Sequence, residues 1–310
     1  MTFYFLLRRA TCIFRSAGFL GLLRIGLNYL WNLGHLFWQD ICWFFLIRRT
    51  RDCPVVTIAH GDRMRLRRDD RGISRELAVY HIHEPLETEL LGKIIEEGMV
   101  VIDIGANIGY YVLIESSLVG PRGQVIAIEP LPANIESLNA NLVLNNIHNV
   151  TVIPAAISDS DGKDNLYLSR SSNWQSLQKT PYWHPALGVR EVATWRLDTL
   201  VEKLKVPVNL VRMDIEGGEV AAFEGMVQTL ERYKPRIAVE MHTSLVGKQS
   251  IINILKRLKT LSYDVTFIID RAKNVPWNKA GHGVRTISID ALMEDKDTIG
   301  AERITTVFLE

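Results

Sequence analysis

The stretch from Val100 to Pro130 constrains the fold more than any other part of the chain. Residues 100–103 are an apolar run typical of a buried parallel strand, and a glycine turn follows at Gly105–Gly109. An apolar helix comes next, and then a second buried strand that ends in an acid, Glu129. A strand, a tight glycine turn, a helix and a second strand with a terminal carboxylate make a nucleotide-binding βαβ unit. We therefore predict a ligand site at this turn.

The alternation of strands and helices continues beyond this unit. Helical patterns cover residues 132–145, 218–232 and 250–261. Seven strands are expected, at residues 100–103, 124–128, 150–157, 209–215, 236–242, 263–270 and 304–309. One open sheet with helices on both faces accommodates this order. We predict an α/β, Rossmann-like fold with a seven-stranded, mostly parallel, doubly wound sheet.

Two smaller parts precede the sheet. Residues 51–97 contain a β-hairpin signal around Gly61 and a helical period over 87–97, which predicts a hairpin-and-helix cap. Residues 1–50 are rich in Phe, Leu, Trp and Arg and predict a helical arm. The expected division is therefore 1–50, 51–97 and 98–310.

The arm has the character of an amphipathic segment. Residues 1–75 carry 13 Arg, no Lys and 5 Asp, a net charge of +8 against +1 for the whole chain. Polar residues recur on one helical face, at Arg24, Asn28, Asn32, His35 and Gln39. Such a stripe disfavours a spanning helix and favours a helix lying in a membrane interface. An arm that packs on protein is the other interpretation, and nucleic acid is not expected as a partner.

Cysteine usage bears on the location of the chain. The three residues Cys12, Cys42 and Cys53 match no metal-binding spacing and favour a reduced setting. The expected location is cytoplasmic. If the arm binds lipid, the chain lies peripherally at the inner face of a membrane.

Polar residues stand where the predicted strands end, and ligands of such sheets bind beyond the carboxyl ends of the strands. Dinucleotide binders place a second glycine where this turn has Asn107. A polar side chain there suits a ligand with a zwitterionic amino-acid end. Asp103 can accept from an ammonium group, and Glu129 can accept from both hydroxyls of a ribose. This favours S-adenosylmethionine. An NAD-type oxidoreductase and a non-catalytic membrane-bound adaptor are the alternatives.

Five short motifs together resemble the FkbM-type methyltransferase family. They are residues 103–109 (DIGANIG), 128–130 (IEP), 155–159 (AAISD), 196–198 (RLD) and 213–219 (MDIEGGE). The resemblance covers about residues 51–250. It implies a class I methyltransferase fold that uses S-adenosylmethionine. It also implies O-methylation of a hydroxyl on a glycan, a glycolipid, a lipid-linked acceptor or a secondary metabolite.

The resemblance also assigns cofactor roles. Asp103, Gly105, Asn107 and Gly109 would hold the methionine end, and Glu129 would hold the ribose. Many class I methyltransferases have an acid after the third strand for the adenine, where this chain has Ala155 and Ala156. The adenine would then be recognised by backbone groups at Ala156, by Ser158 or by Asp159.

The candidate catalytic residues end two further strands. Asp214 and Glu216 follow the fourth strand, and Glu240 and His242 end the fifth, so parallel neighbours would bring them into one crevice. His242 has an ordinary pKa suited to a general base, with Asp214 and Glu216 in the reaction centre. Glu216 or Glu219 could instead only favour a helix N-terminus. No metal is assigned, although a divalent ion held by Asp214, Glu240 and His242 is chemically reasonable.

Residues 169–191 form a long polar stretch between two predicted elements. It contains the aromatic residues Trp174, Tyr182, Trp183 and His184. Loops of this size are usually functional, and aromatic rings suit stacking on a sugar. We predict a lid over the acceptor; the alternative is a surface loop.

Overall fold

The computed structural model describes residues 27, 30–70, 72–169, 175–177, 187–270, 274–277, 283–296, 298–299 and 304–310. The chain divides into two compact units, Met1–Arg51 and Asp52–Glu310. In the first unit, residues 30–49 form one continuous helix. Within the described residues, no helix is both long enough and apolar enough to cross a bilayer. Arg24 and Asn28 of the predicted polar stripe lie outside the described residues.

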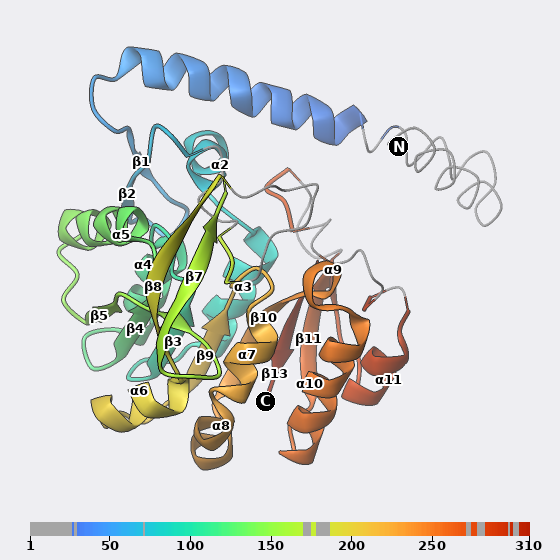
Figure 1. The fold of residues 1–310 in the computed structure, drawn as a ribbon. Coiled ribbons are helices and arrows are strands. Elements are labelled where there is room, and N and C mark those ends of the chain that lie inside the picture. The colour runs from blue at the N-terminus through green and yellow to red at the C-terminus, as the bar shows by residue number, and fades with distance from the viewer. Residues whose placement is uncertain are drawn as a thin grey trace. The chain divides into compact units, whose positions relative to one another are not determined.

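The second unit is built on an eight-stranded sheet of order β12-β11-β13-β10-β9-β3-β4-β5 (Figure 1). Its strands are β3 (Val100–Ile104), β4 (Gln124–Ile128), β5 (Val150–Ile153), β9 (Leu210–Met213), β10 (Arg236–His242), β11 (Val265–Asp270), β12 (Val284–Arg285) and β13 (Ile304–Leu309). Neighbours from β5 through β10 pair in parallel. The chain reverses at β13, which pairs antiparallel with β10 and with β11. The predicted Rossmann-like class I fold is confirmed.

Two details of the predicted sheet need correction. The sheet has an eighth strand, the two-residue β12 at its edge, which is too short to show a pattern in the sequence. The predicted third strand, 150–157, splits after Ile153 into β5 and β6 (Ala156–Ile157). Pro154 stands between the two parts and has no N–H for a sheet hydrogen bond. The break lets β6 join a different sheet.

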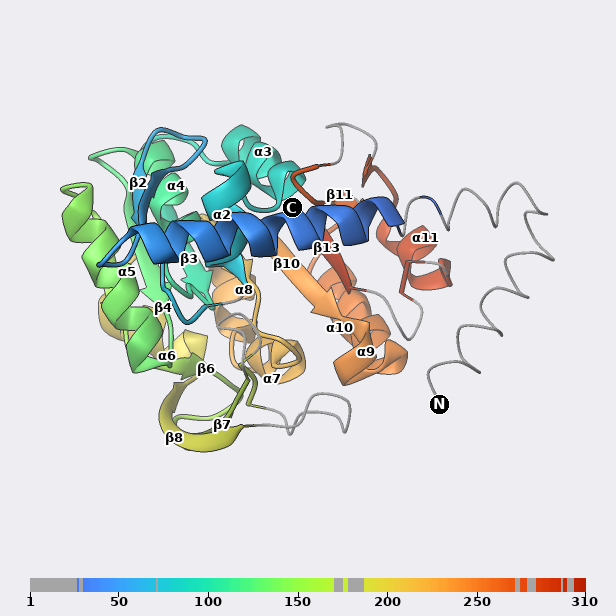
Figure 2. The same ribbon diagram turned by 90° about the horizontal axis from the view of Figure 1, so that it is seen from above.

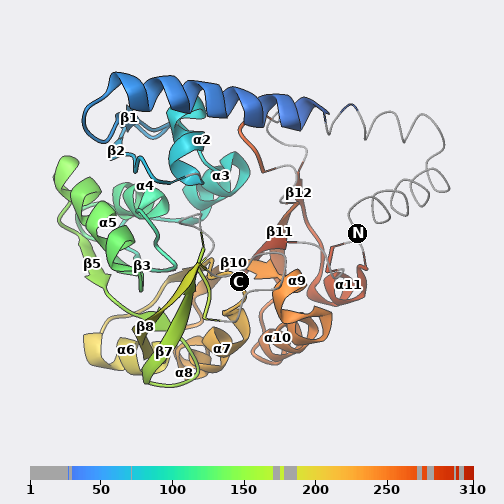
Figure 3. The same cartoon turned by 45° about the horizontal axis from the view of Figure 1, so that its top comes forward.

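That second sheet, of order β6-β8-β7, was not predicted. Strands β7 (Gly162–Leu168) and β8 (Gly188–Trp195) run side by side as an antiparallel hairpin outside the central sheet (Figure 3). β6 pairs in parallel with β8. The hairpin therefore starts next to the carboxyl edge of the central sheet and brackets much of the predicted lid.

Helices cover both faces of the central sheet (Figure 2). One side has α4 (Tyr110–Val119) and α5 (Pro132–Leu144), which contact β3, β4 and β5. The main apolar core lies on the other side, where strand residues such as Ile102 and Val239 pack against helices. These helices are α6 (Leu197–Leu204), α7 (Glu219–Glu224), α8 (Val227–Tyr233), α10 (Lys248–Thr260) and α11 (Ile289–Glu294), and the short α9 (Thr243–Val246) precedes α10.

The expected cap is a hairpin followed by two helices. Strands β1 (Val55–Thr57) and β2 (Arg63–Arg65) pair antiparallel, as predicted. Helix α2 (Ile73–Tyr80) follows, and then α3 (Pro85–Ile94), which begins and ends a few residues before the predicted helix. Backbone N–H groups of β2 donate to the side chains of Asn141 and Asn145 on α5, which ties the hairpin to the main unit.

The predicted helix 218–232 is broken into α7 and α8 around Gly225. A Cβ on Gly225 would lie 2.0 Å from the carbonyl oxygen of Ser158, so this position needs a glycine. Asp198 accepts hydrogen bonds from the backbone N–H and the hydroxyl of Thr229, at 2.7 and 2.8 Å, and so caps the start of α8. Part of the motif 196–198 therefore has a structural role.

Candidate active site

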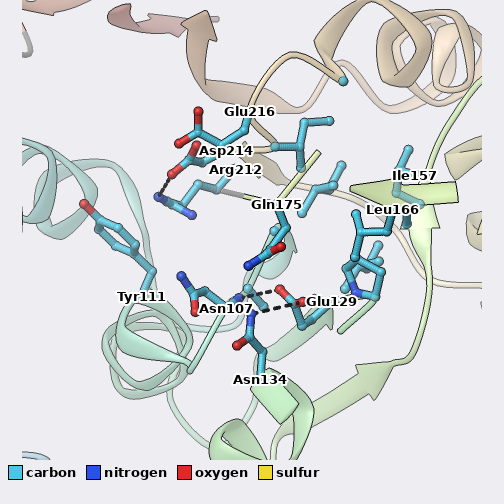
Figure 4. A pocket seen from close by; sticks show the side chains of 18 of the residues that line it. Asn107, Tyr111, Glu129, Asn134, Ile157, Leu166, Gln175, Arg212, Asp214 and Glu216 are labelled. Carbon is cyan, nitrogen blue, oxygen red and sulfur yellow. Dashed lines mark hydrogen bonds and ion pairs between the residues drawn. The ribbon is translucent and has the colours of Figure 1, made fainter. Parts of the chain in front are cut away.

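A pocket opens at the carboxyl edge of the central sheet, between the turn after β3 and the loop after β9 (Figure 4). At one end Ile157 and Leu166 form an apolar wall, and Asn107 and Glu129 lie beside it. At the other end are Arg212, Asp214 and Glu216. We call these the cofactor end and the acceptor end of the pocket.

The glycine turn after β3 approaches other backbone closely. Gly105 has a φ of +90°, and a Cβ there would lie 2.0 Å from the carbonyl oxygen of Asp214. Gly109 has a φ of +92°, and its Cβ would lie 2.4 Å from a methyl carbon of Leu138. A side chain is excluded at Gly105 by backbone, whereas at Gly109 it is disfavoured mainly by the left-handed φ. Gly105 lines the pocket, whereas Gly109 begins α4 behind it.

Asn107 and Glu129 form the polar part of the cofactor end. The backbone N–H of Asn107 donates to Oε2 of Glu129 at 2.9 Å, and that of Leu131 donates to Oε1 at 2.8 Å. Asn134 donates to Oε1 from its side chain at 3.3 Å. Burial raises the pKa of Glu129 to about 7 despite these bonds. Among the described residues, the side-chain oxygen of Asn107 has no hydrogen-bond partner, although it is buried.

Asp103 lies beneath the pocket lining and is fully buried. Its Oδ1 accepts from Nη1 of Arg212 at 3.0 Å. Its Oδ2 has no partner among the residues that the structure describes. Burial raises the pKa of Asp103, and Arg212 offsets this only in part. Asp103 is not on the lining, so it would affect a ligand through Arg212, which it holds and which does line the pocket.

Arg212 is the main residue of the pocket that the sequence reasoning missed. Its Nε donates to Glu87 at 2.9 Å, and its guanidinium carbon lies 3.7 Å from the ring centre of Tyr111. Its Nη2 lies 3.9 Å from Asp214, so the side chain links the buried Asp103 to the acceptor end of the pocket. The sequence does contain a signal for it, because Arg212 is a charged residue inside the otherwise apolar strand Leu210–Met213.

The predicted adenine contacts separate into two groups. Ala156 lines the pocket, together with Ala155 and Ile157. Ser158 and Asp159 are not part of the lining. The N–H of Ser158 donates to the carbonyl of Trp195, and the carbonyl of Asp159 accepts from Arg196. Both residues hold the second sheet in place.

The acceptor end contains four carboxylates around one imidazole. Nδ1 of His242 lies 2.6 Å from Oε1 of Glu219, and both side chains are almost completely buried. Nε2 of His242 lies 3.1 Å from Oε2 of Glu216. It also lies 3.9 Å from Oδ1 of Asp214 and 3.9 Å from Oε2 of Glu240. The structure thus brings Asp214, Glu216 and His242 together, with Asp214 and Glu216 on the pocket lining.

The charges around His242 affect its protonation. Burial by itself would lower the pKa of His242, but the carboxylates of Glu216 and Glu219 outweigh it and hold that pKa well above its usual value of 6.5. Glu216 itself has a φ of +48°, which is uncommon for a residue with a side chain. Such a conformation often occurs at functional sites.

Part of the predicted lid reaches the pocket. Gln175 and Leu177 line it, and the hydroxyl of Ser176 donates to the carbonyl of Glu216 at 2.6 Å. Ser176 also pairs with Tyr167 of β7 through an isolated β-bridge. The four aromatic residues of the lid prediction, Trp174, Tyr182, Trp183 and His184, lie outside the described residues.

The residues at the cofactor end fit S-adenosylmethionine. A buried acid, Glu129, follows β4, the amide oxygen of Asn107 has no partner among the described residues, and apolar Ile157 and Leu166 line the pocket. These groups suit, in turn, a ribose, an ammonium group and an adenine ring.

Comparison with known proteins bears on the family of the chain. A family described as "Methyltransferase FkbM domain" matches residues 103–265, more than half of the chain. Hexuronic acid methyltransferase AglP of Haloferax volcanii is 30% identical over 194 residues, which are 58% of this chain and 73% of that protein. A solved methyltransferase FkbM from Methylobacillus flagellatus has 12% identity and a TM-score of 0.43, over 76% of this chain and 53% of that one.

The family match includes the turn after β3, the acid after β4 and the acidic segment after β9. The predicted enzyme class and cofactor are thereby confirmed. The chain belongs to the FkbM methyltransferase family and is an S-adenosylmethionine-dependent methyltransferase.

Proposed function

We propose that the enzyme transfers a methyl group to a hydroxyl oxygen of a carbohydrate acceptor, part of a glycan, a glycolipid or a lipid-linked sugar. The main support is the acceptor end of the pocket, where Asp214 and Glu216 line the cavity beside a buried histidine. Carboxylates at a pocket suit an acceptor that donates hydrogen bonds, as sugar hydroxyls do. The 30% identity to a hexuronic acid methyltransferase adds the acceptor class.

We assign the cofactor contacts as follows. Gly105 and Asn107 receive the methionine end, and Glu129 accepts from the ribose hydroxyls. Asp103 acts indirectly, because it holds Arg212 at the lining. Gly109 shapes the start of α4 without contact. The adenine lies against Ala156 and Ile157, and Ser158 and Asp159 support that wall from outside the pocket.

The reaction needs alignment and one proton acceptor. S-adenosylmethionine supplies a methyl group on a positively charged sulfur. The contribution of the chain is to hold the acceptor oxygen in line with that group. The oxygen must also lose its proton. The carboxylates of Asp214 and Glu216 line the pocket and are positioned to take it, and His242 lies beside both.

Product analysis tests this assignment. The full-length protein is incubated with methyl-labelled S-adenosylmethionine and oligosaccharides that either contain or lack a hexuronic acid. We expect label on oxygen of a sugar, located by tandem mass spectrometry. Asp214→Asn should reduce turnover at least 100-fold and leave cofactor affinity unchanged, because it alters the acceptor end alone. Label on nitrogen, or no label on any carbohydrate, would contradict the proposal.

We propose further that residues 1–50 bring the enzyme to the cytoplasmic face of a membrane. In the helix 30–49, six large apolar side chains recur in pairs seven residues apart and are all exposed: Leu30, Trp31, Phe37, Trp38, Phe44 and Phe45. Arg48 and Arg49 follow at its end. An apolar stripe with neighbouring basic residues suits an anionic lipid surface.

Flotation of the full-length protein with anionic vesicles tests this contact. The variant with Trp31, Phe37 and Trp38 all replaced by Ser should lose most of its vesicle binding. The control is Val143→Ser, because Val143 is exposed on α5 of the other unit. Equal flotation of all three proteins, or flotation of none, would refute a role for this helix.

A further inference from the structure

We propose that Asp214, Glu240 and His242 form a binding site for a divalent metal cation at the acceptor end of the pocket. The proposal deepens the proposed function, because the cation would lie where the acceptor oxygen has to bind. Cation binding can be measured without methyl transfer, so the two proposals can fail separately.

The geometry of the three side chains suits one ion. Oδ1 of Asp214, a carboxylate oxygen of Glu240 and a ring nitrogen of His242 all lie within 4.8 Å of one another. Nε2 of His242 is 3.9 Å from each of the two oxygens. Ligand atoms about 2.0–2.2 Å from a single ion lie about 3–4 Å apart. The three groups therefore need only small movements to reach a common ion.

His242 is oriented as a metal ligand. Glu219 is fully buried and its Oε1 lies 2.6 Å from Nδ1 of His242. A carboxylate can only accept, so Nδ1 carries the hydrogen and donates it. This leaves Nε2 facing Glu216, Asp214 and Glu240. A carboxylate on one ring nitrogen and a metal on the other is the usual arrangement of ligating histidines.

Nε2 of His242 is buried and faces three carboxylates. The side chain of His242 is 1% exposed, and Nε2 makes no hydrogen bond among the described residues. Glu216 comes within 3.1 Å of Nε2, but outside hydrogen-bonding geometry. Oδ1 of Asp214 is likewise buried and without a hydrogen-bond partner in the described part of the chain. An ion between Nε2, Asp214 and Glu240 would give the buried Nε2 and Oδ1 of Asp214 a shared partner.

The balance of charge favours a cation. Four carboxylates converge on this point, those of Asp214, Glu216, Glu219 and Glu240. Arg212 reaches Asp214 only at 3.9 Å and is already paired with Glu87 and Asp103. A divalent cation would offset the repulsion between these acids. It would also make the site tolerant of an acidic sugar.

The ligand set indicates the class of metal. Two carboxylate oxygens and one imidazole nitrogen suit a first-row transition ion such as Mn²⁺. Carboxylates favour Mn²⁺, and imidazole binds the transition metals that follow manganese, such as iron and zinc. Three protein ligands leave coordination positions for water or for the acceptor. With Asp214 used as a ligand, Glu216 is the remaining carboxylate on the described lining at the acceptor end.

The bonds that change in the reaction follow from this assignment. The O–H bond of the acceptor breaks, and its proton passes to Glu216. The oxygen forms a bond to the methyl carbon while the carbon–sulfur bond breaks, and the electron pair of that bond stays on sulfur. A cation beside the acceptor oxygen would favour loss of the proton.

Calorimetric titration of the chelator-treated full-length protein with MnCl₂ tests the site. We expect one Mn²⁺ per chain. Glu240→Gln and Asp214→Asn should each weaken binding at least tenfold. Glu136→Gln should leave it unchanged, because Glu136 is an exposed acid on α5. No Mn²⁺ binding by the unmodified protein, or binding that survives both substitutions, would overturn the proposal.

A spectroscopic measurement covers variants that fail to fold. Electron spin-echo spectra of the Mn²⁺ complex of the unmodified protein should show the nitrogen of a ligated imidazole. Absence of that nitrogen signal contradicts ligation by His242. If Mn²⁺ binds with this signal but no carbohydrate is methylated, the metal site stands and the acceptor proposal fails. If carbohydrate is still methylated after chelation and Mn²⁺ does not bind, the acceptor proposal stands and the metal site fails.

Discussion

The two ends of the pocket differ in how their ionisable side chains are paired. At the cofactor end, Glu129 accepts from three donors, all within residues 107–134. At the acceptor end, Asp214 and His242 come from separate strands, and each keeps a buried polar atom without a hydrogen-bond partner among the described residues. Paired groups hold a binding site in shape before its ligand arrives. Buried polar atoms without a partner can instead gain a hydrogen bond or a metal bond when a substrate or an ion binds.

Arg212 links the buried acids Asp103 and Glu87 to the acceptor end, and its removal should have the largest effect. Arg212→Met leaves Asp103 and Glu87 buried without their cation, which costs about 3–5 kcal/mol of the free energy of unfolding. Burial already raises the pKa of Glu87 to about 7, and loss of Arg212 would raise it further, because Arg212 lowers it. Urea denaturation monitored by circular dichroism measures the change.

The control for this variant is Arg122→Met. Arg122 pairs with Glu97 at 3.2 Å on the surface, where the side chains are 76% and 55% exposed. Exposed pairs contribute little, so its urea midpoint should stay within error. Equal destabilisation by both substitutions would show that the buried network around Arg212 contributes no more to stability than an exposed ion pair.

Gly105 tests whether the cofactor end is held in shape by its backbone. Gly105→Ala places a methyl group 2.0 Å from the carbonyl of Asp214 and should weaken S-adenosylmethionine binding about 100-fold. Gly98→Ala is a matched control, because Gly98 has a φ of +88° and open space around it. It should cost about 1–2 kcal/mol of stability for the left-handed backbone. Calorimetry with S-adenosylmethionine should show unchanged affinity in that control.

The contrast between the two ends also explains what the sequence could predict. Gly105, Asn107 and Glu129 lie within one βαβ unit, so their spacing along the chain indicates their roles. The partners of Arg212 lie 109 and 125 residues away from it, and no local pattern connects them. Burial of a charge depends on such distant contacts. The network under the pocket therefore became visible only in the fold.

The errors in the predicted elements have the same origin. The helix 218–232 keeps its apolar period, but Gly225 must approach the carbonyl of Ser158 and the helix breaks there. The strands β7 and β8 carry mainly exposed residues and so lack the apolar alternation of a half-buried strand. In both cases tertiary contacts outweigh the local pattern.

Glu129 makes the cofactor end dependent on pH. The carboxylate is the form that accepts from ribose hydroxyls, and the pKa of Glu129 in the free enzyme is about 7. Cofactor binding must then release a proton at low pH, so affinity should be constant above pH 8 and fall as pH drops through 7. Between pH 8 and pH 6 the dissociation constant should rise about tenfold. Calorimetry across this range provides the measurement, and Glu129→Gln should give weaker binding with a flat profile. Affinity that increases towards pH 6 would exclude this role.

Ser176 provides the smallest and most selective test. Its hydroxyl links the segment 175–177 to the carbonyl of Glu216, which stands at the acceptor end with a φ of +48°. Ser176→Ala removes one hydrogen bond of about 1 kcal/mol, so kcat/KM for the carbohydrate acceptor should fall about fivefold. Cofactor affinity should change less than kcat/KM, since the hydroxyl of Ser176 donates to Glu216 at the acceptor end. Cofactor affinity that falls as much as kcat/KM would contradict this expectation. A change made at the acceptor end would then affect cofactor binding and acceptor turnover alike.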